Sequence, residues 1–254
     1  MQRIGFIGTG HIAAPMARAL ARDGHAVTVS ERSADTAAAL ASAGLGIRVA
    51  ANPQVVETSD IVFLCLRPAV WADVVPSLPW RAEHRVISVM AGVPLVALAA
   101  ACAPATELSV TIPYGFIESG GCPLPVAGNP GALTALFGGR NPVLPQTDEA
   151  ALIDHFAAST MTTAALSLLE QASQWLAGQT GDADQAEIYV ANLVTGFLQN
   201  LSLDRSGRLS EARAELATPQ TLNLQMVDGL TRSGTLDALP GILDGIADSM
   251  RARP

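Results

Sequence analysis

Hydrophobic positions in the first 150 residues follow two alternating patterns. Short, nearly continuous apolar runs are typical of strands buried in a parallel sheet. Between several of them apolar residues recur with helical spacing, and Gly24 and Gly44 mark helix ends. The strand-like runs are 3–8, 26–30, 47–50, 61–66, 85–90, 106–112, 123–128 and 141–145, and helices are predicted at 12–23 and 34–42. This alternation predicts an α/β fold with a doubly wound parallel sheet over residues 1–150.

The second part of the chain, residues 151–254, shows only helical periodicity. Residues 164–178 carry apolar side chains at helical spacing, and residues 184–203 are apolar around most of their circumference. A helix with one face in water has a narrower apolar stripe. We therefore expect an all-helical domain over 151–254, with the 184–203 helix buried on several sides, partly by a second subunit. The expected assembly is a homodimer through this domain.

Composition excludes several classes of function. The net charge of −8 argues against nucleic acids and anionic membranes as partners. No apolar run approaches the roughly 18 residues of a membrane span, and no signal segment is recognisable, so we expect a cytoplasmic protein. Three scattered cysteines and four histidines without ligand spacing predict no metal site. We expect His25, His84 and His155 at the surface.

The stretch GTGHIA, residues 8–13, follows the first predicted strand and opens the first predicted helix. Gly8, Gly10 and Ala13 have the spacing G-x-G-x-x-A of a Rossmann-type dinucleotide turn. In such a turn the first glycine makes the bend, the second lets a pyrophosphate approach the backbone, and the third small residue lets helix pack on strand. The helix N-terminus then offers unpaired N–H groups to the phosphates. A tight turn that binds nothing is the alternative, which the strand–turn–helix context disfavours.

The choice between NAD and NADP rests on three residues after the second strand. Glu31 can accept hydrogen bonds from ribose hydroxyls and would repel a 2′-phosphate. Arg32 and Ser33 suit that phosphate. The two signals nearly cancel, with a slight preference for NADP.

With the turn in place, other stretches resemble the pyrroline-5-carboxylate reductases. FLCLRP at 63–68, which includes Leu66, Arg67 and Pro68, resembles that family's strand and lysine-proline loop, with arginine in place of lysine. ISVMAGV at 87–93 resembles its Ser-x-x-Ala-Gly stretch, and SVTIPYG at 109–115 stands at its Met-Pro-Asn loop. Residues 217–234 have the length and Thr-Pro start of its substrate loop and following helix.

The resemblance implies NAD(P)H-dependent reduction of a cyclic imine, a reaction of proline biosynthesis, by a homodimer that intertwines through its helical domains. It implies that Arg67 and Pro68 flank the cofactor and that Ala91 and Gly92 lie near the nicotinamide. The residues that it places along the pyrophosphate are Gly8, Thr9, Gly10, His11 and Ile12.

The sequence departs from the family in the substrate region. The family's loop Ser-Pro-Gly-Gly-Thr-Thr reads Thr218-Pro219-Gln220-Thr221-Leu222-Asn223 here, and without glycine we expect that it cannot copy a backbone with φ > 0. The helix that carries the family's hydrogen-bonding threonine aligns with Asn192 and Leu193. Candidate catalytic residues are therefore Tyr114, which could donate a proton as hydride arrives, together with Asn192 and Thr221. Pyrroline-5-carboxylate itself is a doubtful substrate.

Two other functions stay open. The chain could bind a dinucleotide as a redox sensor or scaffold without efficient catalysis, or it could be a deazaflavin-dependent NADP oxidoreductase. All fifteen basic residues are arginine. The absence of lysine excludes the catalytic lysine on which the 3-hydroxyacid dehydrogenases depend.

Overall fold

The computed structural model describes residues 1–67, 69–90 and 92–252. They divide into two compact units, Met1–Phe156 and Ala157–Ala252. The division falls after Phe156 because Leu152 is buried in the first unit's core and Phe156 packs against that core. No helix in the described part of the chain has both the length and the apolar character needed to cross a membrane.

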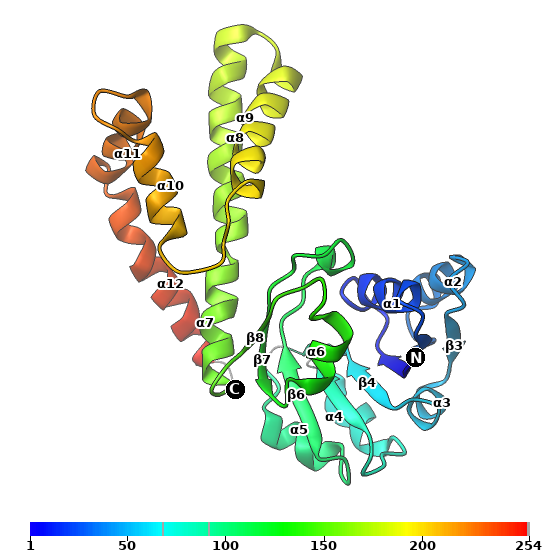
Figure 1. The fold of residues 1–254 in the computed structure, drawn as a ribbon. Helices are drawn as coiled ribbons and strands as arrows, with labels where there is room; N and C mark the ends of the chain where they lie inside the picture. Colours follow the sequence, from blue (N-terminus) through cyan, green and yellow to red (C-terminus); the bar gives the residue numbers. More distant parts are fainter. Residues whose placement is uncertain (68, 91, 253–254) are drawn as a thin grey trace. The chain divides into compact units, whose positions relative to one another are not determined.

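An eight-stranded sheet with the order β3-β2-β1-β4-β5-β6-β7-β8 forms the first unit (Figure 1). Every neighbouring pair is parallel except β6 and β7. The strands are β1 Arg3–Ile7, β2 Ala26–Ser30, β3 Arg48–Ala50, β4 Ile61–Leu64, β5 Arg85–Ser88, β6 Glu107–Thr111, β7 Leu124–Gly128 and β8 Val143–Pro145. Strand order reverses beside β1, which makes the carboxyl ends of β1 and β4 the expected place for a ligand.

Helices and 3₁₀ turns connect these strands. They are α1 Ala13–Arg22, α2 Ala34–Ser42, α3 Asn52–Glu57, α4 Trp71–Val74, η1 Val75–Ser77, α5 Leu95–Ala101, η2 Gly115–Glu118 and α6 Gly131–Phe137, and α7 Ala150–Ser159 crosses into the second unit. The sheet is buried on both faces, because alternate side chains of one strand enter different cores. Phe6 and Phe63 stack in one core with ring centroids 4.8 Å apart, whereas Ile7 and Leu64 lie in the other.

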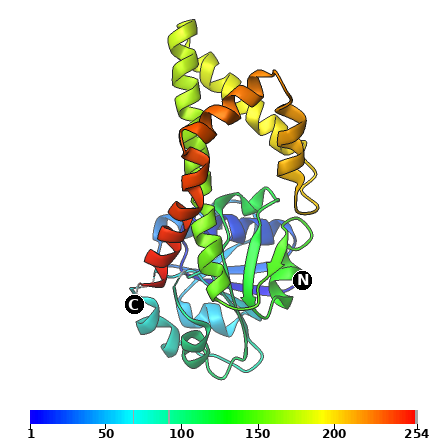
Figure 2. The same cartoon turned by 90° about the vertical axis from the view of Figure 1, so that its left-hand side faces the viewer.

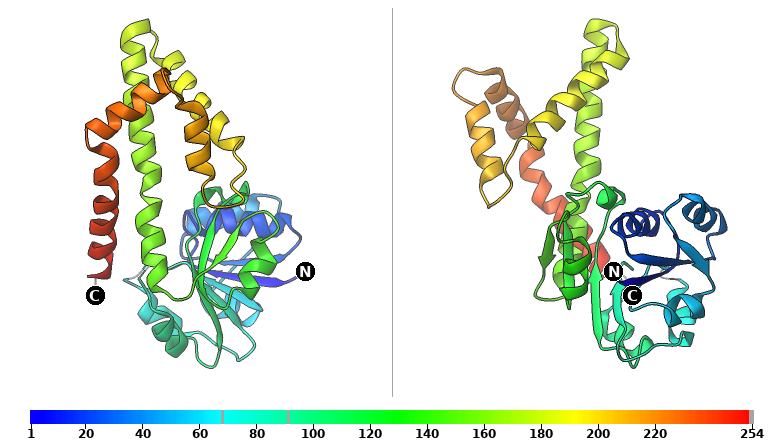
Figure 3. Two further views of the ribbon diagram at one scale, coloured as in Figure 1. Left: turned by 60° about the vertical axis from the view of Figure 1, so that its left-hand side comes forward. Right: turned by 45° about the vertical axis from the view of Figure 1, so that its right-hand side comes forward.

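The second unit is entirely helical over its described residues. Its helices are α8 Met161–Thr180, α9 Ala183–Gln199, α10 Arg208–Leu216, α11 Leu222–Arg232 and α12 Thr235–Arg251. Figures 2 and 3 show α8 and α9 side by side as a hairpin. Within the described chain, the buried residues of this unit are all small: Ala157, Ser173, Ala186 and Ala247. The unit therefore has almost no hydrophobic core of its own.

The predicted fold class, a Rossmann-type sheet followed by an all-helical part, is confirmed. Strand β7 differs from the parallel prediction because the connection from β6 contains only a short 3₁₀ turn and no crossover helix. The 184–203 helix also differs from its prediction, since the chain leaves its apolar side chains exposed. These are Ile188, Tyr189, Leu193, Val194, Phe197 and Leu198 on α9.

Candidate dinucleotide and active site

Candidate residues of the first unit follow the carboxyl ends of neighbouring parallel strands. Glu31 follows β2, Gly8 follows β1, Arg67 follows β4, Gly92 follows β5 and Tyr114 follows β6. Because parallel strands all end at the same edge, the sheet brings segments that are far apart in sequence to one edge. Ligands of open α/β sheets bind at that edge.

The two glycines of the turn differ in their surroundings. Gly8 has φ of +92°, and a Cβ at this position would lie 2.6 Å from the backbone oxygen of Cys65. The fold itself therefore requires glycine there. A Cβ at Gly10 would meet nothing within 4 Å. Gly10 is exposed, so open space adjoins the backbone where a pyrophosphate would need to approach.

Thr9 and Ser30 fasten the glycine turn to strand β2. The Gly8 N–H donates to Ser30 Oγ at 2.9 Å, and Thr9 Oγ1 donates to the Ser30 carbonyl at 2.7 Å. Both side chains are buried. The Thr9 hydroxyl is thus used inside the protein, and Thr9 can offer a ligand its backbone. Ser30 was not singled out from the sequence, although a hydroxyl residue at a strand end beside a glycine turn was a usable signal.

Helix α1 begins directly after this turn. Its N-cap residue is Ile12, whose side chain makes no capping hydrogen bond, and its first turn contains no acidic residue. The Ala14 N–H donates to the Gly10 carbonyl at 3.0 Å. The N–H groups that precede Ala14 at the start of α1 can therefore donate hydrogen bonds to an anion, and the helix dipole favours negative charge there. Next to them His11 is exposed and Ile12 is half-buried.

The residues that would contact the ribose of a bound dinucleotide follow strand β2. Glu31 and Arg32 are both exposed, and Ser33 is half-buried as the N-cap residue of α2. Because its side chain makes no capping bond, the Ser33 hydroxyl can serve a ligand. Glu31, which would favour NAD, and Arg32 with Ser33, which would favour NADP, are thus all accessible to a cofactor.

Further along the edge, Leu66 is buried and Arg67 is exposed. Gly92 is exposed, with φ of +78°. The predicted residues Pro68 and Ala91 lie outside the described residues. Ser88, at the end of β5, is buried and accepts a hydrogen bond from the Met90 N–H at 3.1 Å.

Tyr114 lies at the junction of the two hydrophobic cores and is half-buried. Its ring stacks on Phe116, with centroids 6.1 Å apart and planes 10° from parallel. Its backbone N–H donates to Cys122 Sγ at 3.4 Å. Tyr114 therefore follows β6 at the carboxyl edge, beside the segment that leads from β5 to Gly92, with its ring packed on Phe116 and on both cores.

Two candidates belong to the helical unit. Asn192 is exposed on α9, next to Ala191, which lines a pocket between α8 and α9. Thr221 is the N-cap of α11: its hydroxyl donates to the Thr218 carbonyl at 2.7 Å and accepts from the Leu224 N–H at 3.2 Å. This capping role explains Thr221 without a substrate.

The expectation about the substrate loop was wrong in one respect. Gln220 has φ of +70°, so this residue adopts the left-handed backbone where the similar family has glycine. The loop shape therefore does not need the glycine, although a side chain with a Cβ makes that conformation costly.

Among the described residues, the cysteines and His84 do not form a second site. Burial raises the pKa of the Cys102 thiol to about 12 and raises the pKa values of Cys65 and Cys122 as well, which keeps all three thiols neutral. His84 is buried, contrary to the expected surface position, because its Nδ1 accepts from the Arg81 N–H and its ring packs against Trp80. Burial lowers the pKa of His84. The described residues hold no cluster of potential metal ligands.

Residues 3–92 match the family model described as NADP oxidoreductase coenzyme F420-dependent, which covers about a third of the chain. No curated protein matches at the sequence level. The pyrroline-5-carboxylate reductase of Coxiella burnetii has a similar structure, with 18% sequence identity, a TM-score of 0.86 and coverage of 98% of this chain and 97% of that one. The Plasmodium falciparum pyrroline carboxylate reductase with NADP bound is also similar, with 12% identity, a TM-score of 0.80 and coverage of 99% of this chain and 97% of that one. A reductive aminase from Aspergillus terreus with NADPH and ethyl-5-oxohexanoate is similar over 99% of this chain and 93% of its own, with 18% sequence identity and a TM-score of 0.62. This chain has the two-part fold that these pyrroline-5-carboxylate reductases and the reductive aminase share.

Proposed function

We propose that this chain is an NAD(P)H-dependent reductase that acts on the C=N group of an imine, or on a related carbonyl group, of a small molecule. The observation that carries the proposal is the open space beside Gly10, at the same sheet edge as Arg67, Gly92 and Tyr114. The match of residues 3–92 to an NADP oxidoreductase model and the fold shared with two imine-reducing enzyme classes support it.

The cofactor is proposed to be NADP, with NAD as the alternative. Arg32 is exposed and Ser33 makes no cap, so both can reach a 2′-phosphate. Glu31 is exposed as well and is free to turn toward solvent. The Plasmodium falciparum and Aspergillus terreus proteins, which have a similar fold, bind NADP and NADPH.

The nicotinamide cofactor, when bound, supplies a hydride. The protein must then supply a proton to the nitrogen or oxygen of the substrate as the carbon accepts that hydride. Tyr114 is our candidate donor, since it follows β6 at the carboxyl edge of the sheet and its ring is packed on Phe116. The buried turn contacts of Thr9 and Ser30 hold the backbone N–H groups that would face the phosphates.

The substrate is proposed to be larger or less polar than pyrroline-5-carboxylate. Leu193 stands where the similar family carries a hydrogen-bonding threonine, and the Thr221 hydroxyl is occupied by helix capping. Each unmet hydrogen bond to a buried polar substrate group costs about 1–3 kcal/mol. Two such losses lower the rate by roughly one to four orders of magnitude, at about tenfold per 1.4 kcal/mol. We therefore propose that this protein does not serve proline biosynthesis.

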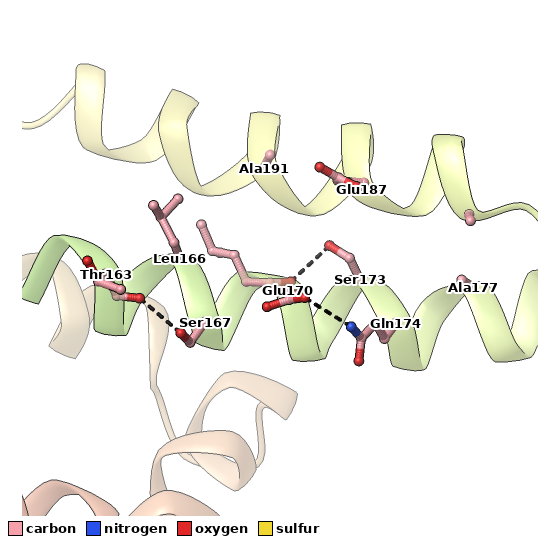
Figure 4. A pocket seen from close by; sticks show the side chains of 11 residues that line it. Thr163, Leu166, Ser167, Glu170, Ser173, Gln174, Ala177, Glu187 and Ala191 are labelled. Carbon is pink, nitrogen blue, oxygen red and sulfur yellow. Dashed lines mark hydrogen bonds between the residues drawn. The ribbon is translucent and has the colours of Figure 1, made fainter. Parts of the chain in front are cut away.

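The assembly is proposed to be a homodimer through the helical unit. Six large apolar side chains of α9 are exposed in one chain, and the unit buries only small residues over its described part. Clustered apolar exposure of this kind marks an interface. Figure 4 shows the pocket between α8 and α9, which has a volume of 560 Å³ and is lined by Leu166, Glu170, Ser173 and Glu187 among others. A second copy of this chain would fill it.

A turnover screen tests the proposed function. NADH and NADPH oxidation would be followed at the nicotinamide absorbance with uncharged cyclic imines of increasing size, with pyrroline-5-carboxylate and with small oxo acids. We expect NADPH oxidation with the apolar imines. Tyr114→Phe should lower kcat by about 10²-fold or more while leaving the dinucleotide Kd unchanged. Tyr189→Phe, the other tyrosine of the chain, is the matched control.

Three results of this screen would contradict the proposed function or the proposed substrate. Tight dinucleotide binding without turnover of any compound would favour the sensor or scaffold function. Turnover that requires an added deazaflavin would favour the F420-dependent class to which the model of residues 3–92 belongs. Rapid proline formation would overturn the proposed substrate preference.

A further inference from the structure

The segment between β6 and β7, residues 112–123, carries Tyr114 and is here called the Tyr114 loop. Its regular structure over this range is the single 3₁₀ turn η2, Gly115–Glu118. Gly120 and Gly121 both have positive φ, and Phe116 is exposed. By local structure alone such a loop would move relative to the sheet.

The last residue of η2 fastens the loop to helix α1. Arg18 Nε donates to both Glu118 carboxylate oxygens, at 2.9 and 3.1 Å, and Arg18 Nη2 donates at 2.6 Å. Arg22, one turn further along α1, also donates to Glu118. The Glu118 side chain is only 18% exposed, so water competes weakly for these bonds. Two arginines of one helix therefore hold a single carboxylate in a fixed orientation.

The far end of the loop is fastened as well. The Cys122 N–H donates to Asn141 Oδ1 at 2.9 Å, and Asn141 Nδ2 donates to the Ile117 carbonyl at 3.4 Å. Asn141 is buried. The Gly121 N–H donates to the Arg140 carbonyl at 2.8 Å. Tyr114 is tied to this end of the loop by its N–H, which donates to Cys122 Sγ at 3.4 Å. The Glu118 contacts differ from all of these because they join the first part of the loop, which contains Tyr114, to helix α1.

Helix α1 is the same helix that begins at the glycine turn, where the Ala14 N–H donates to the Gly10 carbonyl. Figure 1 shows the green loop that follows β6 beside α1. A rigid helix thus joins the proposed phosphate site to the loop that carries the proposed proton donor. The guanidinium fork of Arg18 is suited to this task, because it fixes orientation where a lysine would fix only a point charge.

We propose that Glu118, held by Arg18 and Arg22, is a positioning residue that sets Tyr114 against the bound dinucleotide. This inference rests on the proposed function. Glu118 does not touch substrate or cofactor in this scheme. It acts through Tyr114, by holding the first part of the Tyr114 loop to α1.

Glu118→Gln tests the proposal, since it keeps the size of the side chain and removes its charge. We expect kcat with an apolar imine to fall by about tenfold to hundredfold, the loss typical of small misplacements of a catalytic group. The dinucleotide Kd should stay within about twofold, because the turn is untouched. Amide hydrogen exchange in residues 112–118 should become faster. Arg18→Lys, which keeps the charge and loses the fork, should show the same pattern.

Asp60→Asn is the matched control. It breaks another ion pair of the first unit, Asp60 with Arg3 at the start of β1, and leaves Glu118 and the other contacts of the Tyr114 loop in place. We expect wild-type kcat and wild-type exchange in residues 112–118. In the double variant Tyr114→Phe with Glu118→Gln, the two losses should not add, since one residue acts through the other.

Unchanged exchange in Glu118→Gln would overturn the proposal, and so would faster exchange together with a kcat equal to that of the control Asp60→Asn. Fully additive losses in the double variant would show that Glu118 does not act through Tyr114. If wild-type protein reduces no imine, the proposed function fails, and the exchange of residues 112–118 still decides whether Glu118 holds the loop.

Discussion

At the scale of the residue, Gly8 and Gly10 look alike in the sequence but meet different constraints. Gly8→Val should destabilise the fold by about 2 kcal/mol or more, because a side chain there meets the Cys65 carbonyl at a left-handed backbone. Gly10→Val should leave the melting temperature nearly unchanged and abolish dinucleotide binding. Calorimetric titration with NADPH and thermal unfolding of both variants separate the two effects. Unchanged affinity in Gly10→Val would remove the basis of the dinucleotide site.

Glu31 and Arg32 are both exposed, so their opposite charges can act on the same ribose. Glu31→Ala should strengthen NADPH binding, because a carboxylate near the 2′-phosphate is lost, and should weaken NADH binding, because a hydroxyl acceptor is lost. Arg32→Ala should weaken NADPH binding alone. Fluorescence titration of each cofactor measures these shifts. A wild type that strongly prefers NADH, together with a silent Arg32→Ala, would assign the choice to Glu31 and NAD.

Gln220 occupies a backbone conformation that favours glycine. Gln220→Gly should raise the free energy of unfolding by about 0.5–1 kcal/mol, because the cost of the left-handed conformation exceeds glycine's extra entropy in the unfolded chain. Ala217→Gly in the same segment, where φ is −94°, should lower it by a similar amount. Urea unfolding at one protein concentration compares the two. A loss of stability in both variants would mean that the Gln220 side chain makes contacts worth more than the strain.

At the scale of the element, the apolar runs were sufficient to predict β2 and α2 with their observed bounds, as well as the other strands to within a few residues. The prediction of an all-helical domain over 151–254 covers α12 but gives no bounds for it, and Pro240 lies inside this helix although proline usually ends one. The direction of β7 depends on the length and content of a connection, which apolar periodicity does not report. The contact of Glu118 with Arg18 joins residues a hundred positions apart, so no local pattern could indicate it.

The stability that the ion pairs of Glu118 with Arg18 and Arg22 contribute should also depend on pH. Hydrogen bonds from Arg18, with the nearby charges of Arg18 and Arg22, hold the pKa of Glu118 below its ordinary value of about 4.3. A carboxyl whose pKa is lowered by folding stabilises the fold above that ordinary value, and the contribution is lost as pH falls through the folded-state pKa. Wild type should therefore be more stable than Glu118→Gln at pH 7, and the difference should be smaller at pH 3, below the ordinary pKa of the carboxyl. Urea unfolding at both values measures it, and a constant difference would contradict the ion-pair origin.

At the scale of the whole molecule, the proposed homodimer predicts a measurable mass. Light scattering at micromolar concentration should give twice the 26.2 kDa of one chain. Phe197→Glu on α9 should shift the protein toward monomer, whereas Phe116→Glu should not, although the two rings are equally exposed at 50% and 51%. A wild-type mass near that of one chain would refute the assembly, and dissociation by Phe116→Glu would place the interface on the first unit.

The contrast between a unit with two buried cores and a unit that buries only small residues has a consequence for how the protein matures. The first unit contains both hydrophobic cores, and it leaves the ribosome before the helical unit. The helical unit follows with its apolar side chains uncovered. In the proposed homodimer, its completion would depend on how soon a newly made chain meets another. Chains made faster than they pair would expose α9 to chaperones and proteases, and heating a dilute sample should melt the helices before the sheet.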